Sequence, residues 1–261
     1  MIITLTTDFG LQDAFVGVLK GVIASIDAQV RVVDLTHGIP AQDILAGALT
    51  LRHSITYFPA GTIHVAVIDP GVGSARLPLL IECGGNYFIG PDNGVLSLAI
   101  DERHPTRITR LSNPAYQLQP ASATFHGRDI FAPAAAHLSR GVSPSAFGER
   151  LATFHRLALP KAVRGSREIN GEILYIDRFG NLFTNIEERD LTGLADARLE
   201  IVIGGGVRVV EIAPHYAAAG AGDLVGITNS WGLLEIAAPG ASAERRTGLK
   251  IGDKVKIATV T

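Results

Sequence analysis

Apolar residues in the first half of the chain fall into two alternating patterns. Continuous apolar or β-branched runs predict strands at residues 2–6, 30–35, 63–68 and 79–83. Apolar positions three or four residues apart predict helices that start near residues 15, 44, 94 and 130, and Asp13 and Asp129 are the expected N-caps of the first and the last. Strands in alternation with helices are typical of an α/β domain, here with a mainly parallel central sheet.

The second half of the chain has a different pattern. Short β-like runs follow one another closely and are separated by glycine-rich turns such as residues 204–206 and 220–223. This spacing predicts a small all-β domain, and we expect a barrel. A polar stretch with chain breakers lies between the two patterns. We therefore expect an α/β catalytic domain at residues 1–160, a linker at 161–167 and a β-barrel domain at 168–261.

Composition narrows the class of protein. With 47% apolar and 18% charged residues, the chain is expected to be folded and globular. A net charge of −2 and scattered basic residues favour neither a nucleic-acid partner nor a membrane surface. Cys83 is the one cysteine, so no internal disulfide can form, and we expect it to be a small buried side chain. No signal-like start or membrane-spanning apolar stretch is seen, which favours a cytoplasmic protein.

Polar clusters follow the predicted strands, where α/β sheets usually bind ligands. Asp8 and Asp13 come after the first strand and could bind sugar hydroxyls or an ammonium group, or serve as a turn residue and a cap. Asp69 ends a buried strand, and Arg76 follows in a glycine-containing turn. His126 precedes a helix and could transfer protons or be structural. The residue types alone leave these alternatives open.

Two further clusters of polar residues lie in the β half of the chain, and several polar side chains could also bind a metal ion. Residues 177–181 join two predicted strands, and residues 229–232 follow another, so turn formation alone could explain them. Six side chains could ligate a metal, but none has the spacing of a known metal motif, so we expect no metal site. These side chains are Asp8, Asp13, His37, Asp69, His126 and Asp129.

Taken together, the motifs resemble a known family. The segments that carry the resemblance are residues 7–10 with Asp13, 68–73 with Arg76, 90–94, 124–129, 177–181 and 229–237. The order of these segments and the residues in them closely resemble those of the S-adenosylmethionine hydroxide adenosyltransferases. In that family, water replaces methionine on the adenosyl group and yields adenosine and L-methionine. The likeness covers almost the whole chain.

This resemblance implies a fold, a substrate and a set of site residues. The family has an N-terminal α/β domain and a C-terminal β-barrel, and forms homotrimers with active sites between neighbouring subunits. S-adenosyl-L-methionine is the substrate and no cofactor is implied. The implied catalytic residues are Asp69, Arg76 and His126, and the implied substrate-binding residues are Asp8 for the ribose, Asp13, Asp177 and Ser230 for the methionine end, and Asn181 for the adenine.

The same superfamily contains fluorinating and chlorinating enzymes, so the nucleophile has to be inferred locally. A halide pocket needs uncharged donors and no nearby carboxylate, whereas this chain has Asp69. Trp231 stands where fluorinating relatives place an arginine. The sequence favours activated water that attacks the ribose C5′ carbon in line. The alternatives are a chlorinase-like adenosyl transferase, a non-catalytic adenosine or S-adenosylmethionine binding protein, and a metal-dependent hydrolase.

Overall fold

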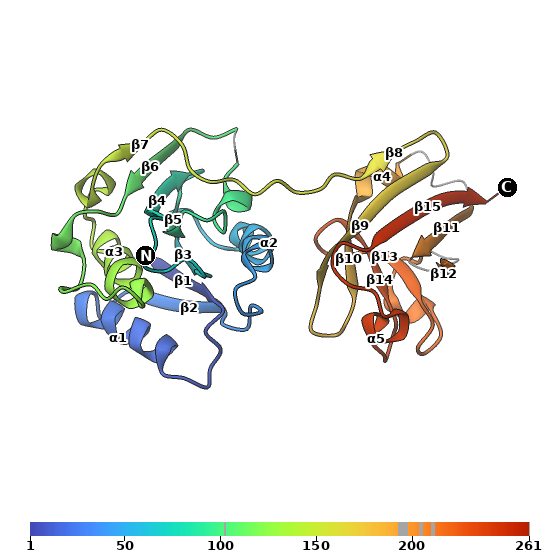
Figure 1. The fold of residues 1–261 in the computed structure, drawn as a ribbon, viewed down its shortest axis with the longest axis horizontal. Coiled ribbons are helices and arrows are strands. Elements are labelled where there is room, and N and C mark those ends of the chain that lie inside the picture. The colour runs from blue at the N-terminus through green and yellow to red at the C-terminus, as the bar shows by residue number, and fades with distance from the viewer. Residues whose placement is uncertain (102, 193–197, 204–205, 210–211, 261) are drawn as a thin grey trace. The chain divides into compact units, whose positions relative to one another are not determined.

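The protein consists of two compact units, Met1–Leu157 and Ala158–Thr261. The computed structural model describes residues 1–101, 103–192, 198–203, 206–209 and 212–260 (Figure 1). Each unit has its own sheet and its own apolar core, as expected when the hydrophobic pattern changes along a chain.

Unit 1 is built on a seven-stranded sheet with the order β2-β1-β3-β5-β4-β6-β7. The first four strands in this order run parallel, and β4, β6 and β7 extend the sheet with antiparallel pairing. The predicted parallel arrangement is therefore confirmed for the half of the sheet that contains β1 and β3. The strands are β1 (Ile2–Thr7), β2 (Arg31–Thr36), β3 (Ile63–Val67), β4 (Pro78–Cys83), β5 (Asn86–Pro91), β6 (Thr106–Arg110) and β7 (Arg150–Leu151).

Three α-helices cover this sheet: α1 (Phe15–Ile26), α2 (Ile44–Ser54) and α3 (Ala132–Ser139). Figure 1 shows α1 and α3 together on one side and α2 on the other. Strand β3 is buried at all five positions, as expected for a strand covered on both faces. Leu19 and Ile23 of α1 share one apolar cluster with Ile3 and Leu5 of β1, so this helix anchors the strand that leads to Asp8.

The N-caps predicted for two helices are wrong. The N-cap of α1 is Ala14, and Asp13 makes no capping bond. Asp129 lies inside a π-helical turn, Gly127–Phe131, that precedes α3, because its carboxylate accepts hydrogen bonds from Arg128 and from the backbone N–H of Ser122 instead of capping a helix. The helix predicted from residue 94 is only a short 3₁₀ turn, Ser97–Ala99.

Unit 2 contains one antiparallel sheet with the order β12-β11-β15-β9-β10-β14-β13. Short β8 (Val163–Arg164) pairs with β9 and lies within the stretch predicted as a linker. Two short helices, α4 (Glu188–Leu191) and α5 (Ala243–Thr247), complete the unit. The other strands are β9 (Glu168–Ile176), β10 (Leu182–Glu187), β11 (Arg198–Ile203), β12 (Val207–Val209), β13 (Val225–Thr228), β14 (Leu233–Ala237) and β15 (Lys254–Val260).

The all-β character predicted for the second half is confirmed, and its core is formed by alternate strand positions such as Ile169, Ile173 and Ile257. Among the described strand pairings, β12 and β13 form the two ends of the strand order, so these pairings establish an antiparallel sheet, and its closure into a barrel stays a prediction. Most of the predicted glycine turn at residues 204–206 lies outside the described residues.

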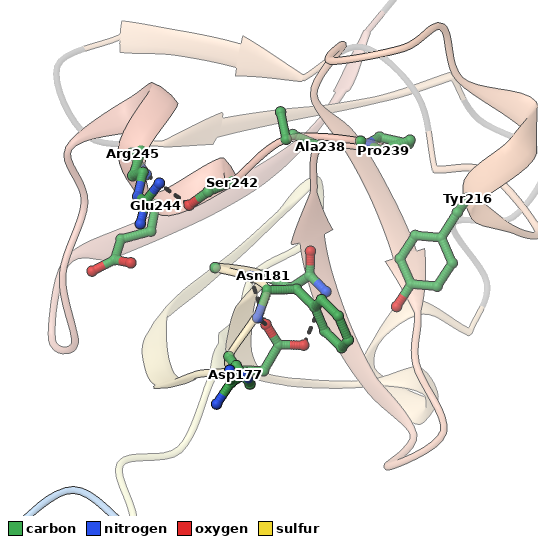
Figure 2. Close-up of a pocket in the computed structure, with 13 residues that line it drawn as sticks. Asp177, Asn181, Tyr216, Ala238, Pro239, Ser242, Glu244 and Arg245 are labelled. Carbon is green, nitrogen blue, oxygen red and sulfur yellow. Dashed lines mark hydrogen bonds between the residues drawn. The ribbon is translucent and has the colours of Figure 1, made fainter.

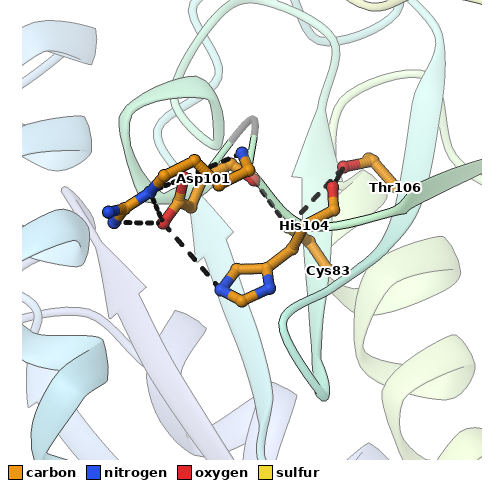
Figure 3. Close-up of polar contacts among 5 residues, drawn as sticks. Cys83, Asp101, His104 and Thr106 are labelled. Carbon is orange, nitrogen blue, oxygen red and sulfur yellow. Dashed lines mark hydrogen bonds and ion pairs between the residues drawn. The ribbon is translucent and has the colours of Figure 1, made fainter.

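Cys83 is buried at the end of β4, as expected (Figure 3). Its thiol donates to the Asp101 carbonyl oxygen at 3.5 Å and accepts from the Thr106 hydroxyl at 3.6 Å. Hydrogen bonds from Arg103 lower the pKa of the Asp101 carboxyl to about 2. The cluster thus ties the segment before β6 to β4. No helix in the described part of the chain is long and apolar enough to span a bilayer.

The core of unit 2 leads to a stability prediction. Ile257 is fully buried, so Ile257→Ala is expected to lower the free energy of unfolding of this unit by about 2–5 kcal/mol, through lost burial and a residual cavity. Urea unfolding followed by Trp231 fluorescence measures it, since Trp231 is the sole tryptophan and lies in this unit. The same change at Ile251, which is 50% exposed, should cost less than about 1 kcal/mol. Equal losses at both positions would contradict this core.

Candidate functional site

Asp69 and Arg76 form a buried ion pair just beyond β3. Their side chains are 6% and 8% exposed. Arg76 Nε donates to Asp69 Oδ1 at 2.9 Å, and Arg76 Nη2 donates to Asp69 Oδ2. This two-point contact uses the planar fork of the guanidinium and fixes both side chains. The carboxylate at the end of a buried strand is therefore neutralised in place.

Two consecutive turns bring Arg76 back toward Asp69. Val72 N–H donates to the Asp69 carbonyl, and Ser74 N–H donates to the Gly71 carbonyl. Gly73 has a φ of +79°, and a Cβ at this position would lie 2.4 Å from the Ala123 carbonyl oxygen. Only glycine permits this approach, which sets the loop after β3 against the segment that leads to His126.

His126 completes the cluster, because Arg76 Nη2 donates to its Nδ1 at 2.6 Å. An acceptor at Nδ1 places the proton of the neutral ring on Nε2. Burial and the positive charge of Arg76 lower the pKa of His126, while Asp69 and Asp129 oppose them. The imidazole is therefore neutral near pH 7 and offers an Nε2–H donor.

Arg76 retains one unused donor. Its Nη1 is buried and has no hydrogen-bond partner among the described residues. The guanidinium carbon also lies 5.5 Å from the centre of the Phe131 ring, a cation–π contact that restrains the side chain. A buried N–H without a partner costs free energy unless a ligand or water accepts from it. The cluster therefore offers both a donor and carboxylate oxygens to a small oxygen ligand.

The loop that carries His126 is held by aromatic packing and by an ion pair. Phe125 makes edge contacts with Phe9 and Phe15, with ring centroids 5.9 and 5.3 Å apart. Buried Asp129 accepts from Arg128 and from the Ser122 N–H, which ties both ends of the loop together. The segment that follows β1 is thereby placed next to the His126 loop.

Asp8 belongs to this neighbourhood and Asp13 does not. Asp8 directly follows β1, whose last residue pairs with the last residue of β3, so Asp8 and Asp69 leave the sheet at the same edge. Asp8 Oδ2 accepts from the Gln42 backbone N–H at 2.8 Å. Asp13 is exposed in the loop before α1, and no described contact joins it to the other predicted site residues.

Two of the three predicted site residues of unit 2, Asp177 and Asn181, line a cavity of about 710 Å³ (Figure 2). Asp177 and Asn181 close the turn between β9 and β10. Asp177 Oδ1 accepts from the backbone N–H groups of Phe179 and Asn181, both at 2.9 Å, and Asp177 Oδ2 accepts from Asn181 Nδ2 at 3.0 Å. The two predicted binding residues are therefore brought together in one rigid turn.

The start of α5 forms another wall of this cavity. Gly180 has a φ of +81°, and a Cβ there would lie 2.0 Å from the Ser242 hydroxyl oxygen. Its carbonyl also accepts from the Glu244 N–H at 2.9 Å. Glycine at this position lets the helix start pack directly on the Asp177 turn, and Arg245 then lines the cavity beside it.

Ser230 lies in a separate turn of unit 2. It is exposed and is not among the described residues that line the cavity. The neighbouring Trp231 stacks on Tyr175, with ring centroids 5.5 Å apart, and meets Phe183 edge-on at 5.0 Å. Position 231 thus carries an aromatic side chain that is held in an aromatic cluster.

Two side chains near the cavity have no assigned role in the sequence analysis. Tyr216 lines the cavity, and its hydroxyl donates to Glu235 Oε1 at 2.7 Å. Glu235 is 1% exposed and belongs to β14, which is otherwise apolar. A single carboxylate within such an apolar strand is the signal that could have found it.

The candidate metal ligands do not converge. Within the described residues, no group of three or more His, Cys, Asp and Glu side chains is placed to hold a metal ion. His37 instead contacts Thr7 Oγ1 through Nδ1 at 2.8 Å, and its Nε2 lies 3.0 Å from Asp34 Oδ1.

Comparison with known families finds matches for both units. Residues 3–148 match the SAM hydroxide adenosyltransferase N-terminal domain, and residues 171–256 match the SAM hydroxide adenosyltransferase C-terminal domain. The two matched segments contain every residue that the sequence analysis singled out for the site.

Similar proteins span the whole chain. A Thermus thermophilus protein named (R)-S-adenosyl-L-methionine hydrolase is 37% identical over 96% of this chain and 97% of its own length. A fluorinase from an Actinoplanes species is 28% identical over 98% of this chain and 97% of its own length. The crystal structure of an uncharacterized conserved protein from Thermotoga maritima is similar with a TM-score of 0.91 and 32% identity, covering 99% of this chain and 100% of that chain.

The contacts of His126 predict opposite pKa changes in two variants. Arg76→Met removes a nearby positive charge and should raise the pKa of His126, whereas Asp69→Asn removes a negative charge and should lower it further. NMR titration of the histidine rings measures both, and His126→Asn assigns the resonance. Arg103→Met, which breaks an exposed ion pair with Asp101, is the control and should leave the pKa of His126 unchanged. Shifts of the same sign in the two site variants would contradict the geometry.

Proposed function

Because the chain belongs to the S-adenosylmethionine hydroxide adenosyltransferase family, we propose that it hydrolyses S-adenosyl-L-methionine to adenosine and L-methionine. The observation that carries the proposal is the contact of Arg76 with both Asp69 and His126, which joins a carboxylate, a neutral imidazole and a guanidinium whose Nη1 has no partner among the described residues in one cluster. Such a cluster is suited to hold one water molecule for attack.

The reaction is a displacement at the ribose C5′ carbon. A water oxygen forms the new C5′–O bond while the C5′–S bond breaks and its electron pair returns to sulfur, which leaves as the neutral thioether of methionine. The water loses one proton, so one proton is released for each adenosine formed. Because a sulfonium is a good leaving group, no general acid is needed, and the barrier lies in activating and orienting the water.

The three residues of the cluster divide this task. Asp69 accepts the proton from the water, since its oxygens keep free lone pairs beside the Arg76 contacts. Arg76 Nη1 donates to the water oxygen as negative charge develops on it. His126 accepts from Arg76 through Nδ1, which holds the guanidinium in place.

Substrate binding is assigned to residues of both units. Asp8 binds the ribose hydroxyls, and Asn181 binds the adenine edge through its side-chain carbonyl oxygen, while its Nδ2 donates to Asp177. Asp13, Asp177 and Ser230 hold the methionine end. A cavity of about 710 Å³ is within the usual range for ligands of this size. The proposal requires no cofactor, and it includes a cytoplasmic location.

The proposal also includes closure of the unit 2 sheet into a barrel. Ile212 makes a parallel bridge with Gly226 of β13, and Ile212 follows β12 closely along the chain. This contact supports closure because it brings the chain from one end of the strand order to the other end.

Water is favoured over halide as the nucleophile. Asp69 is a buried carboxylate at the centre of the cluster and would repel a chloride or fluoride ion. A water molecule, in contrast, can donate to the carboxylate and accept from Arg76 at the same time.

Incubation with S-adenosyl-L-methionine in ¹⁸O-labelled water tests the function. Mass spectrometry should find one label in the 5′-hydroxyl of adenosine. Asp69→Asn should lower kcat by about 10²–10⁴-fold, the usual contribution of a positioned base. The substrate Kd should change little, because asparagine can still accept from Arg76. Asp101→Asn, the same change at a surface pair, is the matched control and should keep full activity.

Other outcomes of that experiment would point elsewhere. Formation of 5′-chloroadenosine in the presence of chloride would assign the chain to the halide-using branch. Binding without turnover would indicate a sensor, and loss of turnover in chelator would indicate a metal-dependent hydrolase. An Asp69→Asn variant with wild-type kcat would remove Asp69 from the mechanism.

A homotrimer with composite sites is the remaining part of the proposal. The water-activating residues belong to unit 1, whereas Asn181 belongs to unit 2, and we propose that neighbouring subunits bring them together. An equal mixture of Asp69→Asn and Asn181→Ala subunits, each inactive alone, should then regain about a quarter of wild-type activity after random assembly.

That mixing experiment has a clear contrary result. If each site used residues of one chain only, every subunit in the mixture would carry a defect, and no activity would return. Sedimentation analysis of the same samples measures the number of subunits.

A further inference from the structure

Glu235 is a buried carboxylate in a place where an apolar side chain would suit the fold. All five residues of β14 are buried, and its backbone pairs with β10 on one side and β13 on the other. Leu234 and Ile236, its neighbours along the strand, belong to the apolar core of unit 2. Burial raises the pKa of Glu235, which reflects the cost of a charge at this position. The strand itself gives no reason for a carboxylate here.

The two oxygens of Glu235 are used by two different parts of unit 2. Oε1 accepts from the Tyr216 hydroxyl at 2.7 Å, and Oε2 accepts from Asn229 Nδ2 at 3.2 Å. Tyr216 follows β12 and lines the cavity, whereas Asn229 starts the turn between β13 and β14. One carboxylate therefore joins two segments that leave the sheet at different places.

The contact with Tyr216 orients an aromatic ring that is otherwise weakly held. The residue is 45% exposed, so packing alone leaves the ring considerable freedom. In Figure 2, Tyr216 lies on the opposite side of Asp177 and Asn181 from Ser242 and Arg245. A hydrogen bond from its hydroxyl to a buried carboxylate fixes the ring at this side of the cavity.

The contact with Asn229 orients an amide. With Nδ2 bound to Glu235, Asn229 Oδ1 points to the backbone and accepts from the N–H groups of Trp231 at 2.9 Å and Leu233 at 3.2 Å. These bonds shape the turn that presents Ser230. Glu235 thereby sets the direction of the amide and, through it, the conformation of this turn.

From these contacts we propose that Glu235 is a positioning residue that couples the Tyr216 side of the cavity to the turn bearing Ser230, so that both are ordered before substrate binds. Tyr216 presents its ring to the adenosyl part of the ligand, and the turn presents Ser230 to the methionine part. The inference rests on the proposed function for the identity of the ligand. The ordering of the two segments does not depend on it.

Substitutions at Glu235 separate positioning from simple stability. Glu235→Leu places an apolar side chain that suits this buried strand, but it removes both carboxylate oxygens that accept hydrogen bonds. It should raise KM for S-adenosyl-L-methionine about tenfold, as expected for the loss of one or two hydrogen bonds, with kcat changed by less than about threefold. Glu235→Gln should restore KM, because its carbonyl accepts from Asn229 and its amide donates to the phenol oxygen.

A matched control measures the cost of losing a buried hydrogen bond in the same unit. Thr184 is fully buried on β10, and its hydroxyl donates to the Leu234 carbonyl at 2.8 Å. Thr184→Val should lower the melting temperature of unit 2 while KM stays at the wild-type value. Tyr216→Phe should reproduce part of the rise in KM that Glu235→Leu causes. In the double variant, the free-energy change calculated from KM should be smaller than the sum of the changes in the two single variants.

The outcomes distinguish this inference from the proposed function. NMR spectra of the Tyr216 ring, recorded without substrate, should show averaging in Glu235→Leu and an ordered ring in the wild type and in Glu235→Gln. Absence of turnover in the wild type would overturn the proposed function and leave this ring test intact. If Glu235→Leu lowers the melting temperature but leaves both KM and the Tyr216 ring unchanged, Glu235 is only structural and the inference is wrong.

Discussion

The guanidinium of Arg76 is the group through which the candidate catalytic residues act together. It contacts both oxygens of Asp69 and Nδ1 of His126, and it keeps one buried donor for a ligand. Since the imidazole is neutral, the three side chains carry no net charge. The charge of Arg76 and its two hydrogen bonds offset the desolvation cost of burying the Asp69 carboxylate at the candidate site, and the tautomer of His126 is determined by the contact with the same guanidinium.

The sequence predicts the parts of the fold that depend on local patterns. Apolar runs locate β1, β3 and β4, and helical spacing locates α1 and α2 within one or two residues. Asp69 could be found because it ends a fully buried strand. The contact of Arg76 with His126 joins residues 50 positions apart, and no spacing rule predicts it. Only the likeness of whole motifs to a family placed these residues in one set.

The errors share a physical cause, because polar side chains can serve the chain in more than one way. The sequence predicts Asp129 as a helix N-cap, yet its carboxylate forms an ion pair with Arg128 inside a π turn. Asp13 is likewise predicted as an N-cap, but the N-cap of α1 is Ala14. Glu235 escapes prediction for the opposite reason, since a position within an apolar strand indicates a core residue and a polar turn indicates a candidate site. In unit 2 the sequence predicts the turn residues Asp177 and Asn181, but it does not predict Glu235, the strand residue that orients Asn229 in the turn before β14.

The π turn at Gly127–Phe131 determines how His126 is rotated about the axis of α3. Such a turn is equivalent to one residue inserted into a continuous helix, and each residue of an α-helix accounts for about 100° of rotation. Loss of a single residue between positions 127 and 131 would leave a regular helix, with Phe131 and the core of α3 in place. His126 would then be turned by about 100° away from Arg76. The geometry of the candidate site therefore depends on chain length in this segment as much as on the identity of its residues.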